Sequence, residues 1–184
     1  MANVAGAVRT WVPDLAHSSV GFVARHMVVT KVRGTFDKFS AKIEIPDGSL
    51  IPSSIVAVIE VESINTREPQ RDTHLRSADF FDAVSHTMIH FKSESIEAAG
   101  DNDFEVQGLL TIRNVTKNVS FGGHAEALGK DPWGNSRIGF EASLRINRED
   151  FGLTWNQTLE TGGVLVGKNI DIELDIQAVP APQQ

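Results

Sequence analysis

Residues 170–178 read Ile-Asp-Ile-Glu-Leu-Asp-Ile-Gln-Ala, a strict alternation of apolar and polar side chains. Successive side chains of a β-strand point to opposite faces of the sheet, so this stretch predicts a strand with one buried face and one wet face. Strands of this kind are typical of antiparallel sheets. The stretch therefore favours an antiparallel β-protein.

The same alternation recurs along the chain. It is regular at 137–147 and 104–113, and less regular in Val20–Ala24, Met27–Val32, Phe36–Ile45, Ile55–Ile64, Met88–Glu97 and Lys117–Leu128. Clusters of turn-forming residues lie at 46–48, 100–102 and 132–134. About eight or nine strands result, which leaves two all-β architectures, a β-sandwich or a closed barrel.

One segment, Thr66–Ala83, breaks the alternation and has apolar residues at helical spacing. Asn65 or Thr66 can cap its start, and Pro69 is tolerated in a first turn. The segment predicts one short helix between two strands.

The composition limits the classes of function. The chain has 184 residues, 17 Lys and Arg against 24 Asp and Glu, a net charge of −7 and no cysteine. This length suits one domain. The average field repels nucleic acid and anionic membranes, and disulfides, thiolate catalysis and cysteine-based metal sites are excluded. There is no apolar run near 20 residues and no basic, apolar leader in Met1–Thr10, so we expect no integral membrane association and a cytoplasmic location.

Reactive residues do not form a convincing catalytic or metal-binding pattern. Asp14, His17 and Ser18 stand close together, but no serine elbow accompanies them, and we expect Asp14 and His17 to bond local backbone at the start of a strand. His86 and His90 lie on a strand-like segment, where four residues span about 13 Å, too far for two ligands of one ion. No glycine-rich cofactor loop precedes a helix. The sequence predicts no catalytic residue, no metal and no cofactor.

The inward faces of the predicted strands mix large and small apolar side chains, which leaves room for a ligand or fits a tapering packed core. If the architecture is a barrel, the alternation predicts that one set of residues lines a channel: Val20, Phe22, Phe39, Ile59, Phe91, Leu110, Phe121, Phe140 and Leu144. The helical segment adds Phe80 and Phe81, which plug one end of the barrel, while Arg71 and Asp72 tie the helix to neighbouring loops. Arg25, Arg71 and His74 are placed near the mouth, where they could meet a polar head group.

Ordered blocks across nearly the whole chain, from Trp11 to Val179, carry a family resemblance. The matching stretches are 11–18, 20–22, 25–27, 32–36, 63–66, 71–81, 108–113, 146–155 and 166–167. With these blocks the chain resembles the YceI family. The resemblance implies one domain over 1–184, with a core of about 10–179 and a flexible tail at 180–184. It implies an extended, lipocalin-like antiparallel barrel of about eight strands with one short helix. It also implies a long central pore for a polyisoprenoid or isoprenoid quinone-type lipid, and Trp155 is added to the expected ligand contacts.

Binding, storage or transport of a long apolar ligand is the function that these expectations favour, without enzymatic activity. Two other classes stay open at this point. An enzyme acting on a lipid or quinone would need a polar group inside the pore, and a ligand-free, stress-related interaction module would have a filled barrel. The sheet edges are also compatible with a homodimer.

Overall fold

The computed structural model describes residues 7–27, 29–132, 134–160 and 162–182. Its elements in chain order are β1 (Val8–Pro13), η1 (Leu15–His17), β2 (Ser19–His26), β3 (Thr30–Phe36), β4 (Phe39–Pro46), β5 (Ser54–Glu60), η2 (Val61–Ser63), β6 (Ile64–Asn65), α1 (Pro69–Arg76), β7 (Met88–Ala98), β8 (Asp103–Ile112), β9 (Val115–Lys130), β10 (Ser136–Asn147), η3 (Arg148–Phe151) and β11 (Val166–Pro180).

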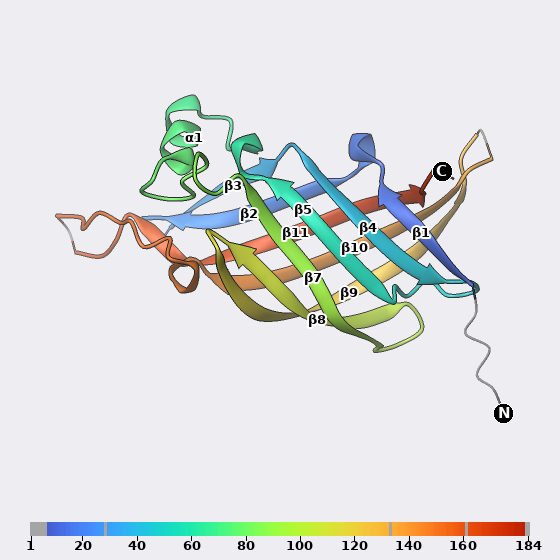
Figure 1. Cartoon of the computed structure of the whole chain (residues 1–184). Helices are drawn as coiled ribbons and strands as arrows, with labels where there is room; N and C mark the ends of the chain where they lie inside the picture. The colour runs from blue at the N-terminus through green and yellow to red at the C-terminus, as the bar shows by residue number, and fades with distance from the viewer. Residues whose placement is uncertain (1–6, 28, 133, 161, 183–184) are drawn as a thin grey trace.

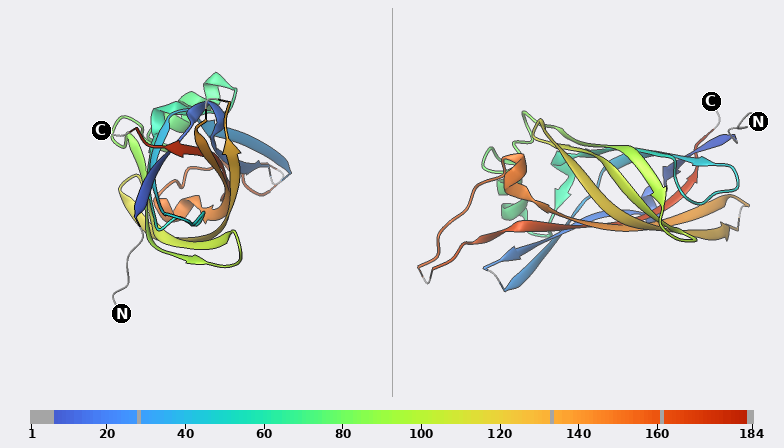
Figure 2. Two further views of the ribbon diagram at one scale, coloured as in Figure 1. Left: turned by 90° about the vertical axis from the view of Figure 1, so that its right-hand side faces the viewer. Right: turned by 90° about the horizontal axis from the view of Figure 1, so that it is seen from below.

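Eight of the strands form a closed antiparallel barrel in the order β1-β4-β5-β7-β8-β9-β10-β11 (Figures 1 and 2). The ring closes where β1 pairs with the end of β11, from Trp11 opposite Pro180 to Pro13 opposite Ala178. β2 pairs with the earlier part of the same edge of β11, and β3 and β6 continue outward from β2. The barrel with a single short helix in the described chain confirms the predicted fold class.

Strand β11 contains the alternating stretch 170–178, and its register explains the alternation. Its apolar residues from Ile170 to Ile176 face the barrel interior, and Asp171, Glu173 and Asp175 lie between them. β10 pairs with β11 from Ile138 opposite Ala178 to Asn147 opposite Asn169. Matching alternation on both strands keeps apolar side chains in register on the inner face.

Several predicted strand boundaries were wrong, because the backbone changes direction and ends a strand within an apolar run. The run Met27–Val32 is not one strand, since β2 ends before Met27, which has a left-handed φ of 50°. The run Phe36–Ile45 is divided between β3 and β4, and Ile55–Ile64 is interrupted by η2. Val28 and Trp133, which belong to a predicted strand and a predicted turn, lie outside the described residues. At the other end, β11 reaches Pro180, and the Ala181 N–H donates to the Thr10 carbonyl at 2.9 Å, so the first two residues of the predicted flexible tail are bound to the barrel. Gln183 and Gln184, which end that tail, lie outside the described residues.

Helix α1 is shorter than predicted. It begins at Pro69, and its N-cap is Glu68, not Asn65 or Thr66, because the Glu68 carboxylate accepts from the backbone N–H groups of Gln70 and Arg71. It ends at Arg76, and the residues after it fold back in turns. In Figure 1 the helix lies beside one end of the barrel.

Two apolar clusters form the core. One includes Val61, Ile64, Ile89 and Phe151, which are all close to fully buried, and Phe80 of the segment after α1. The other cluster gathers Trp11, Ile43, Ile45, Phe104, Val106, Ala125, Ile138, Phe140 and Ala178. Phe91 and Ile176 pack against both clusters and so link them.

Candidate functional site

An apolar cavity of about 250 Å³ lies inside the barrel and is lined by residues of both core clusters. Its wall exposes only apolar atoms. A single water molecule needs roughly 10–15 Å³ of such volume and two to four polar partners. The cavity therefore has the size for a ligand but offers water no hydrogen bonds, which suits an apolar occupant.

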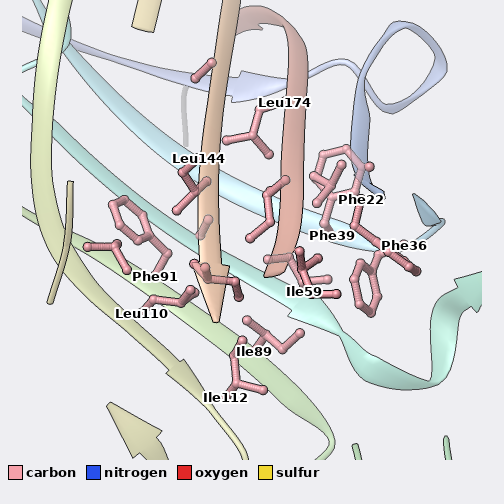
Figure 3. Close-up of a pocket in the computed structure, with 18 of the residues that line it drawn as sticks. Phe22, Phe36, Phe39, Ile59, Ile89, Phe91, Leu110, Ile112, Leu144 and Leu174 are labelled. Carbon is pink, nitrogen blue, oxygen red and sulfur yellow. The ribbon is translucent and has the colours of Figure 1, made fainter. Parts of the chain in front are cut away.

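Side chains from most of the barrel strands converge on this cavity (Figure 3). Phe22 comes from β2, Phe39 from β4, Ile59 from β5 and Phe91 from β7. Leu144 lies on β10, which is on the other side of the ring of strands from β4 and β5, and it also lines the cavity. The wall is thus assembled from residues far apart in the sequence, each placed by the inward face of its own strand.

The interior stays hollow because small residues alternate with large ones on the inner face. Ala41, Ala57 and Ala142 line the cavity and occupy little of it. Two phenylalanine rings also lie over glycines of adjacent strands. A Cβ at Gly108 would lie 2.8 Å from Phe91 Cζ, and a Cβ at Gly123 would lie 2.5 Å from Phe104 Cζ, both closer than real contacts. These glycines leave space at the wall for rings that would otherwise project further into the lumen.

The end of the cavity near α1 is lined by Leu75, Phe80 and Phe81. Phe81 meets Phe36 edge to face at 5.9 Å between ring centroids, and Phe80 packs against Trp155 at 5.3 Å. The segment after the helix therefore covers this end with aromatic rings, in the place that the predicted plug requires.

Arg148 is a buried charge at the border of the cavity and is not among the predicted contact residues. Its Nε donates to the carbonyl of Gly167 at 2.9 Å, and its Nη1 donates to those of Leu153 at 2.5 Å and Trp155 at 3.0 Å. No ion pair to Arg148 is found among the described residues, and burial lowers the pKa of its guanidinium. The side chain therefore fastens the segment between η3 and β11 to the barrel.

Eleven of the fifteen predicted contact residues line the cavity, namely Val20, Phe22, Phe39, Ile59, Phe80, Phe81, Phe91, Leu110, Phe121, Phe140 and Leu144. The other four, Arg25, Arg71, His74 and Trp155, are not part of its wall. Arg25 is exposed near the end of β2. As ligand contacts, all fifteen remain a prediction.

Arg71 and His74 are engaged with the protein itself. Arg71 donates from Nε to Thr66 Oγ1 at 2.8 Å, and buried Asp72 accepts from the Thr66 backbone N–H at 2.8 Å. These contacts tie α1 to the chain before it, as the sequence predicts for Arg71 and Asp72. His74 Nε2 lies 2.9 Å from Asp79 Oδ2. Both groups therefore hold the helix, and neither faces the cavity.

The wall also contains residues outside the predicted set. Ile89 and Ile112 lie two positions from Phe91 and Leu110 on the same strands, so extending the alternation by one step finds them. Leu153 lies in an irregular segment, where no periodic signal exists.

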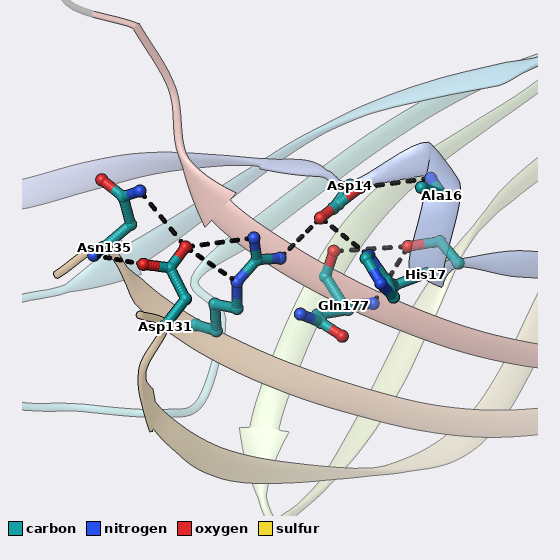
Figure 4. Close-up of polar contacts among 8 residues, drawn as sticks. Asp14, Ala16, His17, Asp131, Asn135 and Gln177 are labelled. Carbon is teal, nitrogen blue, oxygen red and sulfur yellow. Dashed lines mark hydrogen bonds and ion pairs between the residues drawn. The ribbon is translucent and has the colours of Figure 1, made fainter. Parts of the chain in front are cut away.

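A cluster of polar side chains, away from the cavity wall, lies where η1 meets the β9–β10 turn (Figure 4). Arg137 donates from Nη1 to Asp14 Oδ2 at 2.5 Å and from Nη2 to Asp131 Oδ2 at 3.1 Å. Asp14 also contacts His17 Nδ1 at 3.0 Å and accepts from the backbone N–H of Ala16. The Arg137 guanidinium holds the pKa of Asp14 below its usual range. The predicted bonding of Asp14 to local backbone is confirmed, whereas, among the described residues, the His17 ring contacts the Asp14 carboxylate and not the backbone. The link from Asp14 to Arg137 makes the cluster a tie between distant strands.

The described residues meet neither the requirements of a metal site with three or more side-chain ligands nor those of a membrane-spanning helix. No group of three or more His, Asp or Glu side chains among them could hold a metal ion. None of the described helices has the length and hydropathy needed to cross a bilayer.

Comparison with known proteins gives a consistent match over most of the chain. The model of the YceI-like domain matches residues 11–178. A UPF0312 protein of Staphylococcus aureus strain N315 is 37% identical over 161 residues, which cover 87% of this chain and 91% of that protein.

Solved structures with the same fold extend the comparison. Burkholderia cenocepacia BcnA superposes with a TM-score of 0.77 at 25% identity, covering 90% of this chain and 98% of that one. A Campylobacter jejuni YCEI protein gives a TM-score of 0.75 at 28% identity, with 92% and 96% covered. A polyisoprenoid-binding domain from Saccharophagus degradans, at 16% identity and a TM-score of 0.70 with 93% and 98% covered, is similar in fold.

Proposed function

Because this chain belongs to the YceI-like domain family, we propose that it binds a long apolar lipid of the polyisoprenoid class inside its barrel, for storage or transport. The observation that carries the proposal is the apolar cavity of about 250 Å³. The Saccharophagus degradans neighbour, named as a polyisoprenoid-binding domain, supports the class of ligand.

The energetics of the cavity favour an occupant. Each methylene transferred from water to the lumen contributes about 0.8 kcal/mol. A ligand that fills the lumen therefore gains affinity from the burial of its own apolar surface.

Binding fits this wall better than catalysis. General acid–base chemistry needs a titratable side chain within hydrogen-bond reach of the reacting atoms. The cavity wall exposes no polar atom, and Arg148, the charged residue among those that line it, directs its donors to backbone carbonyls. A chain of CH₂ and CH₃ groups matches such a surface.

Native mass spectrometry of the freshly purified protein, followed by organic extraction of the released mass, tests the proposal. The decisive variant is Ala57→Phe, which adds an apolar ring to the lumen without a new polar group. The matched control is Val56→Phe, because Val56 is the neighbouring residue on β5, is 39% exposed and does not line the cavity.

We expect a polyprenyl adduct on the wild type and on Val56→Phe, and little or none on Ala57→Phe. Circular dichroism and thermal unfolding establish that both variants fold. A wild type that stays free of adduct after incubation with polyprenyl lipids contradicts the proposal, as does equal retention by both variants.

A further inference from the structure

The β2–β3 hairpin projects past the barrel at the end where α1 lies (Figures 1 and 2). It lies beside the loop before β11, because the Met27 N–H donates to the Leu165 carbonyl at 2.9 Å. Large apolar side chains are exposed on both segments, with Met27 48%, Val29 81% and Val164 40% exposed. Two neighbouring loops therefore carry apolar side chains into solvent at one end of the molecule.

The stem of the hairpin is cationic. Arg25, Lys31 and Arg33 are all exposed, and the segment 25–33 contains no acidic residue. Arg25 lies directly opposite Lys31 across the β2–β3 ladder, an arrangement of like charges that weakens a sheet. None of the three forms an ion pair with any residue that the structure describes. Asp171 is near enough to interact with this pair, but its carboxylate is already bound by Arg145 Nε at 2.5 Å.

We propose that the β2–β3 hairpin, through Met27 and Val29, and the loop before β11, through Val164, dock onto the surface of an anionic lipid bilayer. A bilayer surface can bind both the exposed apolar side chains and the cations of the hairpin stem, since apolar side chains enter the interface while neighbouring cations contact the lipid phosphates. The net charge of −7 does not prevent docking, because surface charges interact over about 8–10 Å at moderate salt, and the cations Arg25, Lys31 and Arg33 outnumber Glu160, the one acidic residue of the segments 25–33 and 157–165. Separate apolar tips on projecting loops suit a deformable lipid surface better than the flat patch of a protein partner.

The docking surface lies next to the cavity. Ala24 and Val166 line the cavity, and they are three and one residues from Met27 and Leu165. At about 3.3 Å per strand residue, the hairpin tip is roughly 10 Å from the cavity wall. The role of this surface rests on the proposed function: docking holds the end of the barrel that Phe80 and Phe81 cover against the bilayer from which the ligand is taken up.

Vesicle flotation tests the surface without requiring a bound ligand. The probes are vesicles of pure phosphatidylcholine and vesicles of phosphatidylcholine mixed equally with phosphatidylglycerol. We expect binding to the mixed vesicles only, and loss of that binding when salt rises from about 0.1 M to about 1 M, where the screening length falls to about 3 Å.

Paired variants locate the binding. Each cation near an anionic surface contributes about 1 kcal/mol, or about fivefold in affinity, so Arg25→Gln with Lys31→Gln should weaken binding roughly thirtyfold. Met27→Asp with Val29→Asp should remove it. The controls are Arg9→Gln with Lys92→Gln, exposed cations of β1 and β7, and Val8→Asp, which changes a residue 54% exposed on β1. The controls should bind as the wild type does.

The outcomes separate the two proposals. Wild type that fails to bind mixed vesicles but takes up a polyprenyl lipid from detergent overturns the docking surface and leaves the cavity function intact. Vesicle binding that depends on the hairpin, in a protein that takes up no lipid, supports the surface and overturns the cavity function. Equal losses in the hairpin and control variants also overturn the docking surface.

Discussion

Replacing Gly123 by alanine should force the Phe104 ring out of its position. The new Cβ would lie 2.5 Å from Phe104 Cζ and 2.6 Å from Cε2, whereas ordinary contacts begin near 3.4 Å. The ring must therefore move by about 1 Å. Phe104 lines the cavity and packs edge to face on Phe140 at 6.4 Å, so it moves either against that neighbour or into the lumen.

The magnitude follows from two opposing effects. Overpacking a core costs about 1–3 kcal/mol. Gly→Ala gains about 0.4–1 kcal/mol by restricting the unfolded chain where the native φ allows it, and Gly123 has no positive φ. The net loss should be about 1–2 kcal/mol, which lowers the Tm of a domain of this size by roughly 2–8 °C.

The neighbouring glycine supplies the control. Gly122 lies on the same strand and faces outward, where a Cβ would meet Glu105 Oε1 at 3.2 Å, the mobile end of a side chain. Gly122→Ala should therefore be neutral or stabilising by up to about 1 kcal/mol. Unfolding by urea, followed by tryptophan fluorescence and circular dichroism, measures both variants, and native mass spectrometry measures lipid retention.

A double-mutant cycle identifies the cause. Leucine at position 104 lacks the ring atoms that the new Cβ would touch, so Gly123→Ala should cost little in a Phe104→Leu background, with a coupling energy of about 1–3 kcal/mol. The reasoning is refuted if Gly123→Ala costs the same in both backgrounds, or if it is as harmless as Gly122→Ala in both stability and lipid retention.

Three further predictions concern polar side chains. Asp72→Ala should cost about 2–3 kcal/mol in urea unfolding, because it leaves the buried N–H and hydroxyl of Thr66 without their acceptor, and a cost below about 0.5 kcal/mol would contradict this role. The lowered pKa of Asp14 beside Arg137 means that this carboxylate stabilises the fold above its ordinary value near pH 4 and loses that contribution as the pH falls further. The Tm of the wild type should therefore fall more steeply than that of Asp14→Asn between about pH 5 and pH 2. Arg148→Met should cost about 3 kcal/mol or more and expose the segment before β11 to proteolysis, and Arg148→Lys should not restore it, because one ammonium cannot replace the guanidinium fork; full rescue by lysine would argue against the fork.

The fold was predictable where alternation is regular and strands pair along their whole length. The stretches 170–178 and 137–147 pair with each other in one continuous antiparallel ladder. In both strands the apolar residues face inward and the polar residues face outward, as the alternation indicates. Boundaries failed where the backbone turns within an apolar run. β2 ends before Met27, which has a left-handed φ although it is neither glycine nor asparagine, the residues that usually adopt this conformation. Helix α1 is capped by Glu68 and not by the expected Asn65 or Thr66.

The cavity wall was predictable to the same extent, because inward-facing residues follow from the strand pattern alone. Its volume was not predictable, since it depends on which small residues of different strands meet. Phe104 lies over Gly123 and Phe91 over Gly108 only because of the registers between β7, β8 and β9. The role of Arg148 was not predictable either, because its partners are the backbone carbonyls of Leu153, Trp155 and Gly167. Every residue has a backbone carbonyl, so no residue type in the sequence identifies these partners.

The shared edge of β11 sets the order in which this molecule can fold. β11 pairs with β10 through a local connection, but its other edge joins β1 and β2, from which it is separated by almost the whole chain. Closing such long loops is slow, and topologies of this kind fold in milliseconds to seconds. Until β11 docks, β1, β2 and β10 each present an unpaired edge that can join another chain. The barrel strand that comes last in the chain order therefore completes the ring, and the interval before it docks is when the protein is most exposed to aggregation.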